Sequence, residues 1–148
     1  MDVTILDRLL QIGELFQHDM ARAFAGTGLT SARVRVLWVL QHGGPMTQQA
    51  LAAALEVSPR NVTGLVDALE ASGHVRRTPH PSDRRAVLVE LSETARRTMA
   101  QMQRDHAELS ATLLDAVEPG ERAAVERGVA AIADRLAVLV AEAREAES

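Results

Sequence analysis

Four polar residues around the start of one predicted helix carry groups that can hydrogen-bond to the edges of DNA bases. The dipeptide Ser58-Pro59 places a serine at the capping position and a proline at the first helical position, which is a strong helix start. Arg60, Asn61 and Thr63 then face outward, away from the apolar residues of the same helix. Because an arginine can fork to guanine and an asparagine can pair with adenine, this face has the chemistry of base recognition.

A second group of charged residues occupies a polar loop further along the chain. Arg84 and Arg85 lie between two segments with extended character, 74–78 and 86–91. The second segment alternates apolar and polar residues, which is typical of a strand, so the two segments predict a β-hairpin. Asp83 does not help such a loop to bind phosphate. We therefore expect it to hold Arg85 in one orientation, so that this arginine can enter a minor groove.

Helices must position both groups, and the apolar residues supply the pattern for them. Alanine, leucine and valine make up most of the 47% of residues that are hydrophobic. They recur every three or four positions in these expected helices: 2–25, 31–42, 48–56, 59–72 and two more within 93–146. Gly73 follows one helix at a position that favours a left-handed residue. Gly64, inside that helix, is costly unless a DNA backbone, a base edge or a neighbouring helix approaches it closely.

A winged helix-turn-helix accounts for this order of elements, because two helices joined by a short turn are followed at once by the basic hairpin. The predicted fold is therefore mainly α-helical, with a small β-hairpin wing, in a single domain of residues 1–148. Residues 31–92 form the expected DNA-binding lobe. Residues 1–25 and 93–146 carry more apolar surface than so small a lobe can cover, so we expect them to form a helical dimerisation lobe.

The composition excludes several other classes of protein. The 148 residues include no cysteine, which removes disulfides, thiolate metal sites and cysteine nucleophiles. No apolar run reaches the roughly 18 residues of a membrane span, and the first residues lack the basic region of a secretory signal, so we expect a cytoplasmic protein. The net charge is −4, but residues 58–97 carry +2 between more acidic ends, which suits a centre that meets a polyanion.

Neither an enzyme nor a metal site is expected. The chain contains no phosphate loop, no H-E-x-x-H and no G-x-S-x-G sequence. His18 and His106 have acidic neighbours, yet neither has a second histidine four residues away, so we expect surface histidines and no cofactor. The remaining alternative is a winged helix that contacts a protein and not DNA. Such a module would not need Asp83 to brace Arg85, and its binding would depend weakly on salt.

The stretch 29–92 resembles the MarR family of bacterial transcriptional regulators. The most specific piece is the D-x-R sequence in the predicted wing, Asp83-Arg84-Arg85, followed by a strand that ends at Leu91-Ser92. The order of residues in VSPRNVTGLVDALEASG agrees as well. The long N-terminal helix and the two C-terminal helices extend the resemblance to nearly the whole chain. Members often have a glycine where this chain has Ala95, a departure that only extends the helix.

The resemblance implies a homodimer that binds a pseudo-palindromic operator in double-stranded DNA. It further implies a repressor that a small-molecule effector releases from the operator. Its implied recognition-helix contacts are Ser58, Arg60, Asn61 and Thr63, with Asp67 as a further candidate. At the wing it implies a minor-groove contact by Arg85, with Asp83 as its brace, and Arg84 is a further candidate for DNA contact. Weaker candidates for phosphate contact are Arg33, Arg35, Gln48 and Gln49.

An effector pocket is also implied, between the dimerisation helices and the DNA-binding lobe. Phe16, Met20 and Arg22 could line it, since an apolar pocket with one cation suits a small aromatic acid. Trp38, the only tryptophan, is either a wall of this pocket or part of the core.

Overall fold

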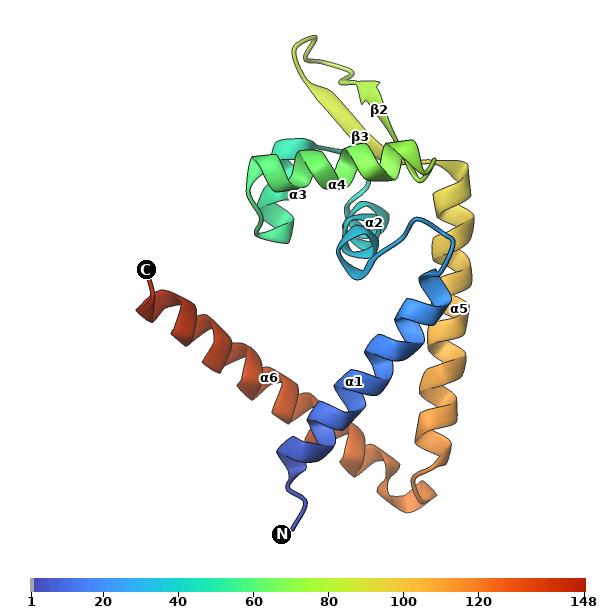
Figure 1. The fold of residues 1–148 in the computed structure, drawn as a ribbon, viewed down its shortest axis with the longest axis vertical. Coiled ribbons are helices and arrows are strands. Elements are labelled where there is room, and N and C mark those ends of the chain that lie inside the picture. Colours follow the sequence, from blue (N-terminus) through green and yellow to red (C-terminus); the bar gives the residue numbers. More distant parts are fainter. Residues whose placement is uncertain (1) are drawn as a thin grey trace. The chain divides into compact units, whose positions relative to one another are not determined.

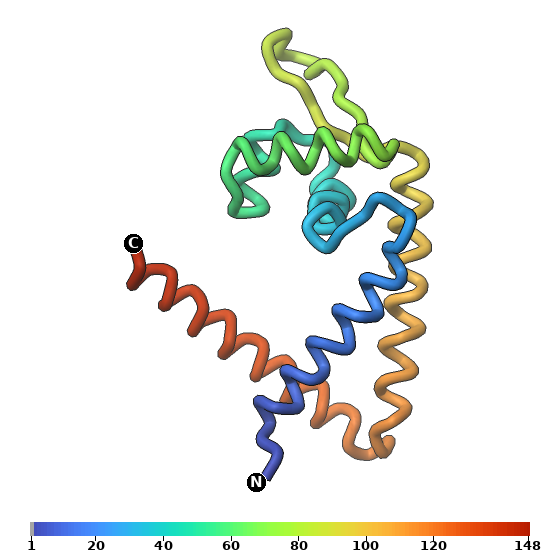
Figure 2. Tube along the Cα trace, in the orientation of Figure 1, coloured from blue at the N-terminus to red at the C-terminus, as the bar shows by residue number. Residues whose placement is uncertain are grey.

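Helices make up most of the chain in the computed structural model, which describes residues 2–148. By its contacts the chain divides into two units, Met1–Met102 and Gln103–Ser148. The first unit holds the start of α5 and these elements (Figure 1): α1 (Ile5–Phe24), α2 (Ser31–Gly43), β1 (Met46–Thr47), α3 (Gln48–Leu55), α4 (Pro59–Ala71), β2 (Val75–Pro79) and β3 (Val87–Leu91). The second unit holds the rest of α5 (Glu93–Asp115), the short 3-10 helix η1 (Pro119–Glu121) and α6 (Arg122–Ala146) (Figure 2).

The mainly helical winged helix-turn-helix confirms the predicted fold class. Each predicted helix of the first unit is present, with ends that differ from the expected ones by three residues at most. Within the single chain, α1 belongs to the same unit as the winged region. The dimerisation lobe expected from residues 1–25 and 93–146 stays a prediction.

Side-chain caps fix where three helices of the winged region begin. Thr30, Thr47 and Ser58 each accept a hydrogen bond from the backbone N–H three residues later, at 3.1–3.2 Å. Each cap satisfies an N–H that the helix itself cannot bond, which stabilises the helix by about 1 kcal/mol. The sequence predicts all three caps, since Thr30 and Thr47, like Ser58, directly precede an expected helix. Gly73 has a φ of +79°, as expected for the residue that follows α4.

The core of the first unit forms where α2, α3 and α4 meet. Leu37, Leu51 and Leu69 supply one fully buried side chain from each of these helices. Val62 and Val66 of α4 are buried as well, and both belong to the predicted apolar stripe. Each such side chain stabilises the fold by about 1.5–3 kcal/mol. Because this stripe faces the core, the opposite face of α4 is left to solvent.

A three-stranded antiparallel sheet forms the wing, with its strands in the order β1-β3-β2. The sequence predicts β2 and β3, but β1 was missed. Met46 and Thr47 of β1 pair with β3, and a strand of two residues has no alternation to detect. In the ladder between β2 and β3, Arg76 lies opposite Glu90.

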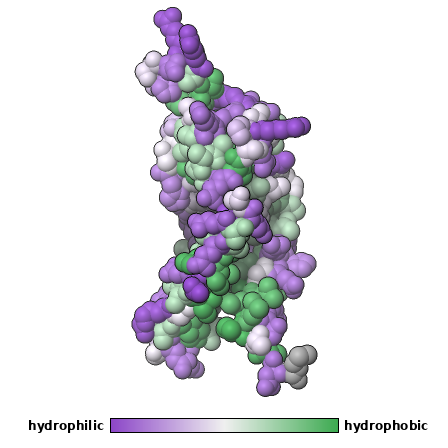
Figure 3. All heavy atoms as spheres, turned by 90° about the vertical axis from the view of Figure 1, so that its left-hand side faces the viewer, coloured by the Kyte–Doolittle hydropathy of each residue, from purple (hydrophilic) through white to green (hydrophobic). Residues whose placement is uncertain are grey.

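α1 and α6 leave apolar side chains uncovered. Neither helix contains a buried residue among those described. Six of the seven large exposed apolar residues of α6 lie on one side of the helix and form a stripe, and Val138 lies on the other side; the six are Val125, Val129, Ile132, Leu136, Leu139 and Val140. Figure 3 shows hydrophobic side chains, in green, at the surface in its lower part. No helix of the described residues is long and apolar enough to cross a membrane. Large exposed apolar patches of this kind are typical of surfaces for protein association.

His74 is a buried polar residue between α4 and β2. Its exposed fraction is 6%, and its Nδ1 lies 2.7 Å from the Oγ of Ser72. The Ser72 hydroxyl also donates to the carbonyl of Leu69, at 3.2 Å. Burial lowers the pKa of His74 below its ordinary value, because the charged imidazolium would lose its contact with water.

We expect the free energy of unfolding to fall as the pH drops below about 6.5, where an unfolded histidine takes up a proton that folded His74 does not. The folded pKa is the lower one, so this stability is present above that pH and is lost as the pH falls toward the folded value. Urea denaturation near neutral pH and near pH 5.5 measures the effect, with His74→Gln, which cannot titrate, as the control. Equal pH dependence in the two proteins would contradict this role of His74.

Candidate nucleic-acid interface

The first turn of α4 presents polar side chains to solvent. The Oγ of Ser58 accepts a hydrogen bond from the backbone N–H of Asn61, at 3.1 Å, and Pro59 occupies the first helical position. The side chains of Arg60 and Asn61 make no hydrogen bond or ion pair with the other described residues. Their donors and acceptors are therefore available to a ligand.

An open groove of about 600 Å³ lies beside this turn. Its lining residues come from α4 and from the start of α2: Arg33, Ser58, Arg60, Asn61, Gly64 and Leu65. A Cβ at Gly64 would have no neighbour within 4 Å, so packing against another helix does not account for this glycine. Arg33 donates to the carbonyl of Gly28 at 2.6 Å, and its other guanidinium N–H groups remain for a ligand.

The guanidinium of Arg77 connects the wing to two helices. From β2 it donates to Asp67 at 2.5 Å and to Glu70 at 2.8 Å, both on α4. It also donates to the Oε1 of Gln48 on α3, from Nε at 3.1 Å and from Nη2 at 2.9 Å. The Arg77 side chain is only 26% exposed, so these bonds are partly shielded from water.

The hydrogen bonds of this cluster form a chain in which Arg77 donates to Gln48, Gln48 donates to Thr63 and Thr63 donates to the backbone. A guanidinium can only donate, so Gln48 turns its oxygen toward Arg77 and its amide nitrogen toward the Oγ1 of Thr63, 3.1 Å away. The Thr63 hydroxyl then donates to the carbonyl of Pro59, at 2.9 Å. Thr63 lies on the exposed face of α4 and retains its methyl group and one lone pair for a ligand.

Two carboxylates stabilise the charged guanidinium of Arg77. Burial alone would lower the pKa of this guanidinium, but the hydrogen bonds and negative charges of Asp67 and Glu70 outweigh burial and raise the pKa above its ordinary value. Asp67, a candidate base contact by resemblance, thus already has a partner on the wing. Gln48, a candidate phosphate contact, is engaged in the same way.

Arg84 and Arg85 lie in the loop between β2 and β3, at the tip of the wing (Figure 1). Neither side chain makes a hydrogen bond or ion pair with the other described residues. Arg76, in contrast, pairs with Glu90 across the ladder at 2.6 Å. The wing therefore offers two arginines to a ligand at its tip, while those on β2 are used within the fold.

The restraint predicted for Asp83 acts on the main chain. Its Oδ1 accepts a hydrogen bond from the backbone N–H of Arg85, at 3.0 Å. Among the described residues, no ion pair joins this carboxylate to the Arg85 guanidinium. Asp83 thus shapes the turn that carries Arg85 and leaves the guanidinium itself to solvent.

The connecting role of Arg77 was missed in the sequence. Its partners Glu70, Asp67 and Gln48 lie 7, 10 and 29 residues away along the chain, so no local pattern joins them. The one available signal is the alternation of a strand, which turns adjacent residues such as Arg76 and Arg77 to opposite faces. That signal separates the two arginines without naming their partners.

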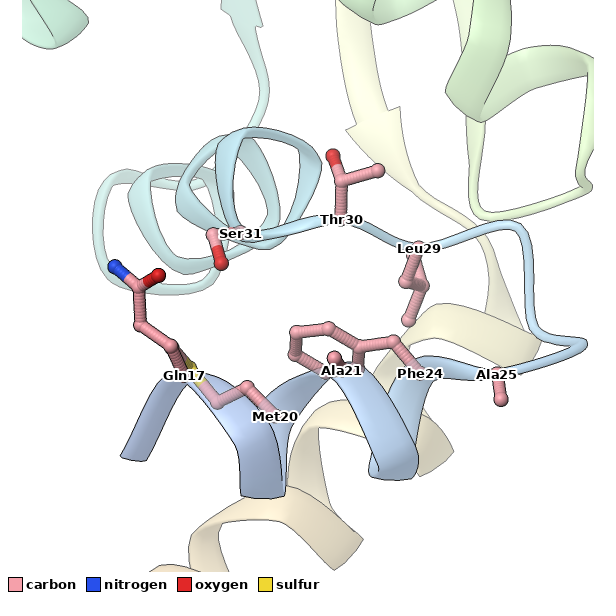
Figure 4. A pocket seen from close by; sticks show the side chains of 8 residues that line it. All are labelled: Gln17, Met20, Ala21, Phe24, Ala25, Leu29, Thr30 and Ser31. Carbon is pink, nitrogen blue, oxygen red and sulfur yellow. The ribbon is translucent and has the colours of Figure 1, made fainter. Parts of the chain in front are cut away.

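A pocket of about 470 Å³ lies between α1 and the start of α2 (Figure 4). In Figure 4, Gln17, Met20 and Phe24 of α1 face the segment Leu29–Ser31 across it. Of the four predicted effector contacts, Met20 is among its lining residues. The structure places the other three elsewhere: Phe16 is exposed, Arg22 pairs with Asp19, and Trp38 packs against the core. No group of acidic residues and histidines in residues 2–148 could hold a metal ion.

The chain is similar to known regulators in sequence. The sequence profile of the MarR family matches residues 29–87. The HTH-type transcriptional repressor NicR of Pseudomonas putida is 30% identical over 132 residues, which cover 84% of this chain and 84% of NicR. The uncharacterized HTH-type transcriptional regulator YfiV of Bacillus subtilis is 31% identical over 109 residues, which cover 73% of this chain and 68% of YfiV.

Solved structures share the fold over most of the chain. FabT of Streptococcus pneumoniae, solved in complex with DNA, matches with a TM-score of 0.80 at 20% identity, over 91% of this chain and 96% of FabT. RV1404 of Mycobacterium tuberculosis matches with a TM-score of 0.75 at 26% identity, over 90% of this chain and 95% of that one. The winged helix-turn-helix is thus shared with a protein that has been seen on DNA.

Arg77→Ala is expected to lower the free energy of unfolding by about 1–3 kcal/mol, because it removes the guanidinium that donates to the Gln48 oxygen and to the carboxylates of Asp67 and Glu70; Glu70 keeps only the bond from the backbone N–H of residue 77. Arg76→Ala is the matched control, because it removes the same charge from the adjacent residue but breaks a single exposed ion pair. It should lower the free energy of unfolding by about 1 kcal/mol or less. Urea denaturation of both variants and the parent measures the difference. Equal losses in the two variants would show that Arg77 does not connect the wing to the helices.

Proposed function

The chain belongs to the MarR family of transcriptional regulators, and from this premise we propose that it is a homodimeric repressor acting in the cytoplasm. In this proposal it binds a pseudo-palindromic operator in double-stranded DNA, leaves it when a small molecule binds, and has no enzymatic activity. The observation that carries the proposal is the set of side chains without partners among the described residues: Arg60 and Asn61 on α4, and Arg84 and Arg85 on the wing. Among the similar proteins, NicR and YetL are named as repressors.

α4 is the recognition helix of the proposal. A helix fits the major groove, and its first turn brings side chains to the base edges. Arg60 can donate two bonds to guanine, and Asn61 can both donate to and accept from adenine. Gly64 supports this reading, since the groove at its Cα is open and leaves room for DNA to approach. Thr63 adds its methyl group and remaining lone pair.

The wing and the helix starts position the protein on the phosphate backbone. Arg84 and Arg85 carry two positive charges at the wing tip, where they can enter the neighbouring minor groove. Ser58 uses its oxygen to cap α4, so its hydroxyl proton can go to a phosphate at the helix N-terminus. Arg33 lines the protein groove beside the first turn of α4, close to Ser58. Such contacts fix the register of the protein and make its binding depend on salt.

Dimerisation explains the apolar stripe on α6. Leu136 is 58% exposed and Val129 is 55% exposed in the single chain. A second copy that covers the stripe would remove this apolar surface from water. Two recognition helices in one dimer also match two half-sites about one DNA turn, or 34 Å, apart.

The pocket beside α1 is the proposed effector site. Phe24, Met20 and Leu29 give it an apolar lining, and Thr30 and Ser31 add hydroxyl groups at the start of α2. A small, largely apolar molecule with one polar group fits such a lining. α2 also contributes to the core of the winged region. A molecule that moves the first residues of α2 can therefore alter the geometry of the DNA-binding lobe.

Selection of bound sequences from a random DNA duplex pool tests the proposal. The purified full-length protein is used at a low and at a higher salt concentration. We expect enrichment of an inverted repeat whose half-sites lie about one helical turn apart, and binding that falls steeply with salt. No enrichment and no binding at low salt would reject the proposal and favour a winged helix that contacts a protein.

Arg85→Ala is expected to weaken operator binding by about 1–3 kcal/mol, which is roughly 5- to 150-fold in Kd, because the wing loses a contact to DNA. Arg97→Ala is the matched control, since it removes the same charge from an exposed position on α5. Fluorescence anisotropy with the selected operator measures both. Affinities that change equally in the two variants would remove the Arg85 contact from the proposal.

Leu136→Glu is expected to convert the dimer to monomers at micromolar concentration, because it places a charge in the proposed apolar interface. Ala141→Glu adds the same charge to the opposite side of α6, about 140° away at 100° per residue, and should leave the dimer intact. Analytical ultracentrifugation reports the mass of each protein. A parent chain that sediments as a monomer would contradict the homodimer directly.

A further inference from the structure

The imidazole of His80 organises the tip of the wing. Its Nδ1 lies 3.1 Å from the backbone nitrogen of Ser82 and 3.1 Å from that of Asp83, and both N–H groups point to it. The Ser82 hydroxyl is also close, with its Oγ 3.3 Å from the same nitrogen. One ring nitrogen thus accepts the hydrogen bonds that begin the turn.

The remaining bonds of the turn build on these two. The Asp83 carboxylate accepts from the N–H of Arg85 at 3.0 Å, and the Asp83 carbonyl accepts from the N–H of Ala86 at 3.2 Å. The backbone N–H of His80 donates to the backbone carbonyl of Ala86, also at 3.2 Å, and closes the loop. The backbone that carries Arg84 and Arg85 is therefore held by bonds that start at the His80 ring.

These contacts demand one protonation state of the ring. Nδ1 can accept hydrogen bonds only while it carries no proton, so the neutral ring must hold its proton on Nε2. A histidine side chain can take up a second proton between pH 5 and 8. That proton would occupy Nδ1, face the two backbone N–H groups and remove both bonds.

Few other charges act on the ring. The charged side chains of the loop itself are Asp83, Arg84 and Arg85. On the two strands next to it, Arg76 pairs with Glu90, and Arg77 pairs with residues of α4. Within residues 2–148, no hydrogen bond or ion pair joins the His80 ring to a residue outside the turn. Its protonation therefore acts on the turn first.

We infer that His80 is a positioning residue for the DNA contact of the wing, and that its protonation releases that contact. The inference rests on the proposed function, because it needs the wing arginines to touch DNA. An asparagine or aspartate in this place would accept the same N–H groups through a side-chain oxygen, as in an Asx turn. A histidine does so only when it is neutral, which makes the wing sensitive to pH.

Operator affinity of three full-length proteins tests this inference: the parent chain, His80→Asn and His80→Ala. Near pH 7.5 we expect the parent and His80→Asn to bind alike, and His80→Ala to bind roughly 5- to 10-fold more weakly, a part of the loss expected for a whole wing contact. Near pH 5.5 the parent should approach His80→Ala, whereas His80→Asn keeps its advantage. Since all three proteins contain His74, its effect on stability cancels in the comparison.

The amide protons of Ser82 and Asp83 supply a second measurement that involves no DNA. In NMR spectra of the free protein, both signals should shift with pH in the parent and should not shift in His80→Asn. Signals that stay constant in the parent would overturn the hydrogen bonds on which the inference depends.

The outcomes separate this inference from the proposed function. If the parent binds the operator and its affinity follows that of His80→Asn at every pH, His80 does not position the wing and the proposed function stands. If the parent binds more tightly than His80→Asn at low pH, attraction of the imidazolium to phosphate outweighs the turn, and the inference is wrong. If no protein binds any duplex at low salt, the proposed function fails and the inference fails with it.

Discussion

The hydrogen bonds of Arg77 hold the candidate interface in one geometry. Buried apolar side chains pack α2, α3 and α4 against one another. In the wing, β3 buries Val89 and Leu91, but β2 has less apolar support, since Val75 is its one buried residue. Two residues further along, Arg77 reaches both α3 and α4 and compensates for the missing apolar contact. The position of β2 relative to α4 therefore depends on one polar side chain with several partners in addition to the apolar core.

Much of the fold is predictable because its determinants are local. The caps Thr30, Thr47 and Ser58 each act within three residues, and the stripe of α4 repeats within one helix. The exceptions are contacts between distant segments. β1 has two residues and exists only because β3 lies beside it, and the partners of Arg77 are spread over α3 and α4. Neither feature leaves a periodic trace in the sequence.

The residues of the candidate site likewise divide into those that local sequence predicts and those that depend on contacts between distant segments. Arg60 and Asn61 are predictable from their position after a Ser-Pro helix start, and the structure finds both exposed without partners among the described residues. Asp83 was expected to restrain Arg85, but its contact with the main chain could not be read from residue types. Prediction of the effector contacts was weaker still. Pocket walls depend on which faces of α1 and α2 meet, so Met20 alone of the four lines the pocket found here.

The internal bonds of α4 sort its outward residues into two kinds. Thr63 and Asp67 are tied to the rest of the lobe, so a substitution at either alters the frame of the interface together with its surface. Arg60 and Asn61 have no such ties among the described residues, so their replacement changes the surface alone. Under the proposed function, a duplicated copy of the gene can therefore acquire a new operator with the least loss of stability through changes at Arg60 and Asn61. The same two positions are the natural ones to randomise when a new specificity is engineered.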